Sequence, residues 1–150
     1  MKRNIHTITG GFGYTGTYLS KALIKHGKIV ETLTNSPEKK AIDSQILAVH
    51  PLDFENEEGL IDSLKNTEVL YNTYWVRFNH KWFNHQQAVT NTFKLFYAAK
   101  EAGVRRIVHV SITNADSKSN LDYFRGKGEI EEYLKKLGLD YTIVRPAVLF

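Results

Sequence analysis

Tyr123 and Lys127 lie four residues apart in a segment with the pattern of a helix, so both side chains are expected on one helix face. A lysine ammonium near a phenol favours the phenolate and lowers the pKa of the phenol. Such a tyrosine can exchange a proton with a substrate oxygen near neutral pH. The pair therefore predicts acid–base chemistry. In the competing interpretation, Tyr123 packs at the start of the helix and Lys127 lies in solvent.

A hydroxyl group that could hold the substrate oxygen precedes this pair. Ser111 is expected at the end of a strand, and Thr113 is an alternative two residues later. Asn91, on an earlier predicted helix, could bridge the lysine to a water molecule, although an asparagine on a helix is more often polar surface. The predicted catalytic residues are Ser111, Tyr123, Lys127 and Asn91.

A turn rich in glycine occupies residues 9–16, Thr-Gly-Gly-Phe-Gly-Tyr-Thr-Gly, between a short apolar run and a helical pattern. Gly10 and Gly11 permit backbone angles that a side chain would forbid. Gly13 lets the backbone approach a pyrophosphate, and Gly16 lets the helix pack closely on the strand. The helix N-terminus adds free amides and the positive end of a dipole. The turn predicts a dinucleotide site, against the alternative of a glycine-rich turn without a ligand.

The residue that follows the second predicted strand often separates NAD sites from NADP sites. An acid there binds the ribose hydroxyls of NAD, and a basic residue accommodates the 2′-phosphate of NADP. This chain has Thr34 and Asn35 at that place, while Glu31 falls in mid-strand, too early to reach the ribose. Lys39 and Lys40 could reach a 2′-phosphate, but such pairs are more often solvated. The choice between NAD and NADP stays open.

The adenine end of the site is expected after the third strand. Asp53 could accept a hydrogen bond from the adenine amino group, or it could cap a turn, and the two interpretations have similar weight. Phe54 could flank the ring. The predicted cofactor-binding residues are Gly10, Gly11, Phe12, Gly13, Tyr14, Gly16, Thr34, Asn35, Asp53, Phe54, Thr73 and Lys127.

Alternating strands and helices must position these residues. Strands are predicted over 4–9, 28–34, 45–50, 68–75, 105–111 and 141–145, and helices over 14–26, 57–65, 82–102 and 121–137. This alternation predicts a doubly wound parallel sheet of the Rossmann type with helices on both faces. Right-handed crossovers give the strand order 3-2-1-4-5-6. On the first helix we expect Leu19, Ala22 and Leu23 on the buried face.

Composition excludes several classes of protein. The chain has 150 residues, no cysteine and a formal net charge of +4, so disulfides and thiolate chemistry are absent. The basic pairs are scattered, and Glu131 with Lys135 and Glu132 with Lys136 are expected on a solvated helix face, so nucleic-acid binding is not expected. No stretch looks like a signal peptide or a membrane span, and His80, His85 and His109 lack the spacing of metal ligands. We expect a cytoplasmic protein without a metal or a membrane partner.

Together these residues resemble the short-chain dehydrogenase/reductase superfamily, in its extended or atypical branches. The turn at 9–16 matches the cofactor motif of that family, and Asp53 matches its adenine contact. The catalytic candidates follow its order Asn-Ser-Tyr-Lys, and Arg145-Pro146 matches its Arg-Pro after the sixth strand. Segments 123–127 and 141–146 look closest to the NAD-dependent epimerase/dehydratase-like group, which is similar to an accessory subunit of respiratory complex I.

The resemblance implies an NAD(P)-dependent oxidoreductase or epimerase/dehydratase that acts on a carbonyl or secondary alcohol of an unknown small-molecule substrate. Tyr123 would be the acid or base, Lys127 would tune it and bind the nicotinamide ribose, and Ser111 would orient the substrate oxygen. The family's smaller C-terminal lobe selects the substrate. We expect residues 1–150 to be the NAD(P)-binding Rossmann domain alone, truncated before that lobe, because the chain ends on uncapped apolar residues. A homo-oligomer is compatible with this assignment.

The sequence also departs from the family pattern. Thr34-Asn35 replace the usual charged residue, and the predicted fourth strand ends in bulky side chains, Tyr74 and Trp75, where small residues usually pass close to the nicotinamide. Gly126 and Gly128 flank Lys127 and would weaken that turn of helix. These departures favour an alternative, a non-catalytic NAD(P)-binding regulatory or assembly protein.

Overall fold

The computed structural model describes residues 4–38, 45–76 and 84–147. Strands and helices alternate along the chain, as the sequence pattern predicts. The elements are β1 (Ile5–Thr9), α1 (Tyr14–Lys25), β2 (Ile29–Thr34), β3 (Ala48–Pro51), α2 (Glu57–Leu64), β4 (Thr67–Asn72), α3 (His85–Glu101), β5 (Arg106–Val110), α4 (Asp122–Lys136) and β6 (Asp140–Val144).

The six strands form one parallel sheet in the order β3-β2-β1-β4-β5-β6. Successive strands are added towards one edge of the sheet from β1 to β3 and towards the other edge from β4 to β6. The loops that follow β1 and β4 therefore lead to opposite sides. Ligands of doubly wound sheets bind in the crevice that forms at such a switch point. The predicted Rossmann-like fold and its strand order are confirmed.

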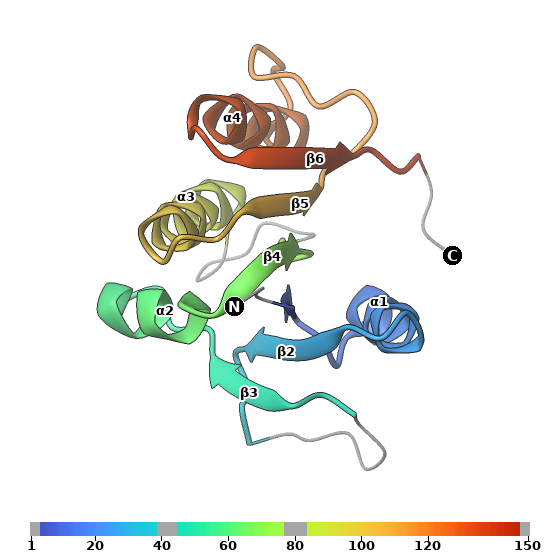
Figure 1. Ribbon diagram of the computed structural model, residues 1–150. Coiled ribbons are helices and arrows are strands. Elements are labelled where there is room, and N and C mark those ends of the chain that lie inside the picture. Colours follow the sequence, from blue (N-terminus) through green and yellow to red (C-terminus); the bar gives the residue numbers. More distant parts are fainter. Residues whose placement is uncertain (1–3, 39–44, 77–83, 148–150) are drawn as a thin grey trace.

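The two faces of the sheet are covered differently (Figure 1). Helices α2, α3 and α4 lie side by side on one face, and α1 lies on the other. The main apolar core fills the first interface, where Leu70 and Ile107 of the sheet pack with Phe96 and Leu134 of the helices. On the α1 face, an apolar groove of about 460 Å³, lined by residues that include Tyr18 and Val108, is open over β4, β5 and β6 in the described part of the chain. The expectation of helices on both faces therefore holds fully only for β1 and β2.

Helix α1 approaches the sheet through its smallest residues. Gly16 and Ser20 are its buried positions, whereas Ala22 is exposed and Leu19 and Leu23 are only partly buried. A Cβ added at Gly16 would lie 2.0 Å from the carbonyl oxygen of Gly10. The predicted buried face was therefore wrong at Ala22, because close backbone contact, rather than a stripe of large apolar side chains, sets how this helix is turned.

The fourth strand ends three residues earlier than predicted. The hydroxyl of Thr9, at the end of β1, accepts hydrogen bonds from the amides of Thr73 and Tyr74 at 2.8 and 3.2 Å. The Thr73 hydroxyl in turn donates to the Thr9 carbonyl at 2.6 Å. These bonds draw the chain out of the ladder after Asn72, so Trp75 lies beyond the sheet rather than in it.

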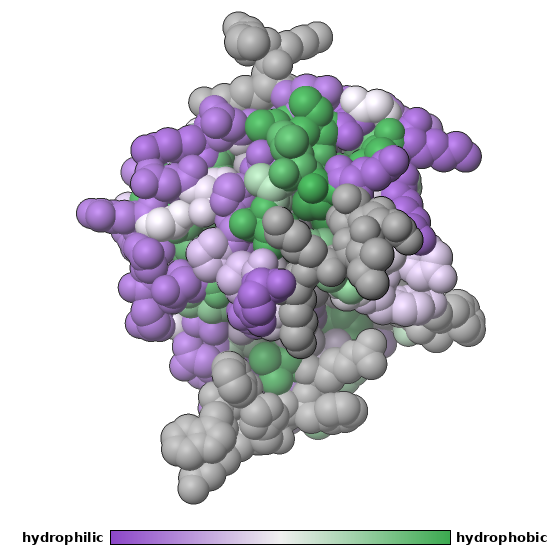
Figure 2. Space-filling view, turned by 90° about the horizontal axis from the view of Figure 1, so that it is seen from below, coloured by the Kyte–Doolittle hydropathy of each residue, from purple (hydrophilic) through white to green (hydrophobic). Residues whose placement is uncertain are grey.

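Strand β3 forms one edge of the sheet, and Figure 2 looks at the molecule from that side. The strand includes Pro51, which an edge tolerates because its missing amide has no ladder partner to lose. The surface in this view is hydrophilic along both sides, with apolar side chains gathered through its middle. Ile29 and Leu47, near the starts of β2 and β3, are among the exposed large apolar residues.

Replacing Gly16 with alanine should lower the free energy of unfolding by about 2–3 kcal/mol, the usual cost of forcing an atom into a filled contact, because the new methyl group would collide with backbone at 2.0 Å. Urea denaturation followed by circular dichroism measures this change. Gly59→Ala is the control, since the nearest atoms that its Cβ would meet belong to the side chain of Asn56, which can turn aside at the cost of its capping hydrogen bond. Equal stabilities for the two variants would contradict the close contact.

Candidate functional site

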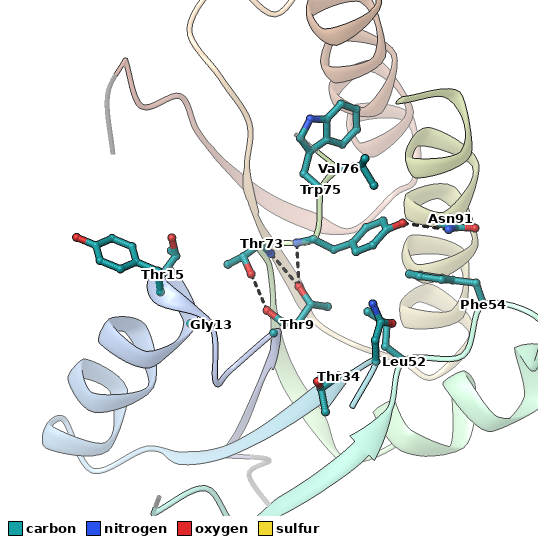
Figure 3. Close-up of a pocket in the computed structure, with 15 residues that line it drawn as sticks. Thr9, Gly13, Thr15, Thr34, Leu52, Phe54, Thr73, Trp75, Val76 and Asn91 are labelled. Carbon is teal, nitrogen blue, oxygen red and sulfur yellow. Dashed lines mark hydrogen bonds between the residues drawn. The ribbon is translucent and has the colours of Figure 1, made fainter. Parts of the chain in front are cut away.

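A cleft of about 690 Å³ opens at the carboxyl ends of β1, β2 and β4 (Figure 3). It runs between the start of α1 and the side of α3. The lining residues of this cleft are Thr9, Gly10, Gly13, Tyr14, Thr15, Gly16, Thr34, Asn35, Leu52, Phe54, Thr73, Tyr74, Trp75, Val76 and Asn91. Its place matches the switch point of the sheet, where the sequence predicts a dinucleotide.

The glycine turn is held by short hydrogen bonds. Gly10 has a φ of +67°, and its amide donates to the carbonyl of Leu33 at 2.8 Å. Gly11 does not need an unusual backbone angle. Its amide donates to the hydroxyl of Thr32 at 2.8 Å, and a Cβ added there would lie 2.7 Å from that oxygen. The prediction that both glycines serve backbone freedom is thus corrected for Gly11, which serves close approach.

The start of α1 leaves its amides free for an anion. Gly13 is the N-cap, no side chain caps the helix, and no acidic residue lies in its first turn. The first amides of a helix need an acceptor and carry the positive end of the helix dipole. Gly13 and Gly16 present no side chain between those amides and the cleft. The turn therefore fits a pyrophosphate group. Of the predicted contacts, Gly11 and Phe12 are not among the lining residues.

The adenine end of the cleft is uncharged in the described part of the chain. Thr34, Asn35, Leu52 and Phe54 line it. The Asp53 carboxylate instead accepts a hydrogen bond from the Glu55 amide at 3.0 Å, which is the turn-capping interpretation of this residue.

Glu31, the acid weighed for the ribose end, does not line the cleft. It lies within β2, as expected, and its carboxylate binds the His50 imidazole at 3.0 Å, a partner that the sequence did not predict. Lys39 and Lys40, the candidates for a 2′-phosphate, lie outside the described residues.

Bulky side chains after β4 form the opposite wall. The Tyr74 ring packs on the Phe54 ring, with ring centres 4.9 Å apart. The Tyr74 hydroxyl accepts a hydrogen bond from the side-chain amide of Asn91 at 3.0 Å (Figure 3). Asn91 also accepts a hydrogen bond from Gln87 at 3.0 Å. Burial raises the pKa of Tyr74. Asn91 is therefore at the cleft, as predicted, but its hydrogen bonds hold the tyrosine wall rather than a lysine-bound water.

Ser111 lies away from the cleft, in a buried polar cluster. Its hydroxyl donates to the Glu131 carboxylate at 2.6 Å, and Arg145 binds the same carboxylate through two nitrogens at 2.9 and 2.7 Å. The alternative hydroxyl, Thr113, is exposed and donates to the Arg145 carbonyl at 3.4 Å. Ser111 therefore binds a carboxylate on α4, whereas the sequence predicts that its hydroxyl orients a substrate oxygen.

Sequence reasoning missed Glu131, which was expected on a solvated face with Lys135. Its side chain is 6% exposed. Burial raises the pKa of Glu131, but the hydrogen bonds from Arg145 and Ser111 outweigh burial and hold that pKa below its ordinary value. The one available signal was the Arg-Pro match at 145–146, because a guanidinium next to the end of β6 can pair with an acid on the neighbouring helix.

Lys127 and Tyr123 lie behind the wall of the cleft, on α4. The Lys127 ammonium lies over the Trp75 ring, 4.3 Å from its centre, and donates to the Val110 carbonyl at 3.1 Å. Tyr123 meets the same indole edge-on, with ring centres 5.5 Å apart. Burial lowers the pKa of Lys127 to about 7, against the opposing effect of Glu131. The predicted pair thus shares one neighbour, Trp75, and neither member lines the cleft.

The two glycines beside Lys127 have packing roles. A Cβ at Gly126 would lie 2.9 Å from the Val89 side chain and 3.1 Å from the Trp75 indole. A Cβ at Gly128 would lie 2.2 Å from the backbone nitrogen of Ser117. Both glycines are therefore required by close neighbours, which gives a packing reason for residues that the sequence showed only as a cost to the helix.

Replacing Glu131 with glutamine should lower the free energy of unfolding at neutral pH by about 2–3 kcal/mol, since it breaks a buried ion pair whose arginine is partly solvated. The pKa of Glu131 is depressed in the fold, so its contribution is present above the unfolded pKa and is lost as the pH falls through the folded pKa. Urea denaturation at several pH values should show the difference from the unmodified protein shrinking in acid.

The matched control is Glu132→Gln on the same helix. Glu132 is exposed and binds Ser117, so its loss should cost less than about 0.5 kcal/mol. If both variants behaved alike at every pH, the stabilising role assigned to Glu131 would be wrong.

Known proteins match this chain over most of its length. A family described as NAD(P)H-binding matches residues 10–150. The 40 kDa subunit of NADH-ubiquinone oxidoreductase from Neurospora crassa is 25% identical over 150 residues, which are 96% of this chain and 40% of the relative. The NADPH-dependent quinone oxidoreductase QOR2 of Escherichia coli, solved with NADPH, is similar with a TM-score of 0.78 and 26% identity over 93% of this chain and 48% of its own.

The WbmH enzyme of Bordetella bronchiseptica, solved with NAD+, has the same fold, with a TM-score of 0.78 and 21% identity over 96% of this chain and 56% of its own. The chain thus spans about half the length of these relatives. They confirm NAD or NADP as the cofactor class and the resemblance drawn from the glycine turn. The chain belongs to the NAD(P)H-binding family.

Proposed function

We propose that this chain is the cofactor-binding part of an NAD(P)-dependent oxidoreductase or epimerase/dehydratase that acts on a carbonyl or secondary alcohol. The observation that carries the proposal is the short path from the cleft to an acid–base pair. Trp75 lines the cleft, and Tyr123 and Lys127 both contact its ring. One side chain separates the dinucleotide site from the candidate proton donor.

The bound dinucleotide would accept or donate the hydride. Tyr123 would give a proton from its hydroxyl to the substrate oxygen during reduction and take it back during oxidation. Lys127 is partly protonated at neutral pH because burial brings its pKa to about 7, so its charge would stabilise the phenolate. Ser111 would keep β5, α4 and β6 in register through Glu131 instead of binding the substrate.

Substrate choice belongs to the whole protein. Because the chain spans about half of its relatives' length, we propose that residues outside 1–150 complete the substrate pocket. The cytoplasmic location expected from the sequence stays a prediction, and one relative is a mitochondrial subunit by its name.

A non-catalytic regulatory or assembly role is the second candidate. The observation in its favour is that Lys127 is 3% exposed beneath Trp75 and that Asn91 is bound to Tyr74. In addition, the Neurospora crassa relative is named as a subunit of a larger enzyme. On this view the protein binds the dinucleotide without turnover.

Titration calorimetry with NAD, NADH, NADP and NADPH should detect binding of at least one pair. Gly13→Asp and Gly13→Ser form a matched test, because both residues are good N-caps and both add a Cβ at the same place. The aspartate puts a negative charge beside the pyrophosphate, so it should weaken binding at least about tenfold more than the serine does. Equal affinities for the two variants would contradict the assignment of the anion site to α1.

Tyr123→Phe should lower kcat for reduction of a panel of small aldehydes and ketones by at least about 100-fold, the usual contribution of a general acid. The assay follows loss of reduced nicotinamide absorbance in the longest chain that contains these residues. Dinucleotide affinity should stay nearly unchanged, because the phenol lies behind Trp75.

The control for this substitution is Tyr133→Phe, on the same helix but stacked on Phe93 away from the cleft. Full activity in the Tyr123 variant would rule out its acid–base role. Dinucleotide binding with no turnover by any variant would favour the non-catalytic candidate.

A further inference from the structure

Trp75 occupies the boundary between the cleft and the acid–base pair. It follows β4 by three residues, and Figure 3 shows its indole projecting from the end of that strand towards α4. One side of the residue lines the cleft. The other side meets Lys127, Tyr123 and His85, whose imidazole stacks on the indole with ring centres 5.5 Å apart. The ring lies over Lys127, which is 3% exposed, whereas Tyr123 is only partly buried.

The indole of Trp75 packs into a gap between α4 and α3, which we call its seat. Gly126 on α4 leaves the space that the ring edge fills, since a Cβ there would lie 3.1 Å from the indole. Val89 on α3 borders the same space. A larger residue at position 126 would push the ring out of this seat. Gly126 thus makes room for the indole against α4; it does not serve to make the helix flexible.

The seat is incomplete in one respect. The indole nitrogen of Trp75 is buried and has no hydrogen-bond partner among the described residues. A buried N–H without a partner is unfavourable, and movement of the ring out of its seat would give this group access to water or a ligand. Meanwhile the Lys127 ammonium keeps a hydrogen bond to the Val110 carbonyl that does not depend on the ring. The indole is therefore held by ring contacts with His85, Tyr123 and Lys127, and a ligand that displaces it breaks no hydrogen bond of the indole nitrogen.

We propose that Trp75 is a gate which the nicotinamide half of the dinucleotide opens, exposing Lys127 and Tyr123 to the cleft. The proposal rests on the proposed function, since it assumes that the dinucleotide lies in this cleft. Without ligand the indole covers Lys127 and keeps it from the cleft. With ligand it turns away, and the lysine becomes reachable from the cleft. Gly126 and Trp75 would thus act together, the first by providing the seat and the second by filling it.

Tryptophan fluorescence reports the gate directly. The chain has two tryptophans, Trp75 and Trp82, and Trp82 lies outside the described residues. In a Trp82→Phe protein, NAD or NADP should shift the Trp75 emission to longer wavelength and increase its quenching by acrylamide severalfold. AMP, or 2′-phospho-AMP for an NADP-specific site, lacks the nicotinamide half and should change neither. Oxidised dinucleotides are used because they do not absorb the emitted light.

Calorimetry on the same protein separates the two claims. Dinucleotide binding with unchanged emission and quenching would overturn the gate and leave the binding function intact. Absence of binding by any dinucleotide would overturn both. An equal response to the adenylate half would also overturn the gate, because the adenine end lies across the cleft from Trp75.

Chemical labelling gives a second measurement that needs no ligand. Trp75→Ala removes the gate, so acylation of Lys127, read by mass spectrometry of its peptide, should rise about tenfold or more if the open state of the unmodified protein is a minor one. Phe54→Ala, another aromatic truncation in the cleft wall, should leave Lys127 labelling unchanged because Phe54 packs on Tyr74 instead. Unchanged labelling in a folded Trp75→Ala protein would contradict the gate.

Discussion

The close contact between Gly16 and Gly10 determines how the cofactor end of this molecule is built. A helix can come this near to a strand-ending turn only where the helix residue lacks a side chain, since a Cβ at Gly16 would lie 2.0 Å from the Gly10 carbonyl oxygen. That approach brings the free amides of α1 to the carboxyl edge of the sheet. It also fixes the rotation of the helix, so Ser20 is buried and Ala22 is exposed. The contact between Gly16 and Gly10 therefore determines both the position of the anion site and the packing of α1.

The other wall of the cleft depends on a single hydroxyl. Thr9 ends β1, and its hydroxyl oxygen accepts hydrogen bonds from the amides of Thr73 and Tyr74. It also donates to the Asn72 side chain at 3.2 Å, and Asn72 donates to the buried His109 at 3.1 Å. Burial, with a contribution from Lys127, lowers the pKa of His109 to about 3, so this core histidine stays neutral. The network ends β4 at the switch point and directs Trp75 out of the sheet.

The fold and the cleft could be predicted from the sequence because their signals are local. Strand–turn–helix patterns and the glycine spacing at residues 9–16 depend on neighbours in the chain. The partners of Ser111 could not be predicted in this way. Glu131 looked like half of a surface pair with Lys135, and only the folding of β6 beside β5 brings Arg145 to it. The sequence left two interpretations of Asp53 for a related reason, since turns and ligands use the same carboxylate; the structure shows the turn-capping bond to Glu55.

Two features that argue against catalysis in the sequence have a different meaning in the structure. Bulky residues after β4 and glycines around Lys127 each look like defects when they are considered singly. In the structure they are complementary, because Gly126 makes room for the Trp75 ring and that ring covers Lys127. A protein that only bound a dinucleotide would have no need to keep a lysine and a tyrosine together behind its cleft, nor to seat an indole over them. The joint arrangement is what the proposed reaction centre would need, since the Trp75 ring covers Lys127 before the cofactor binds.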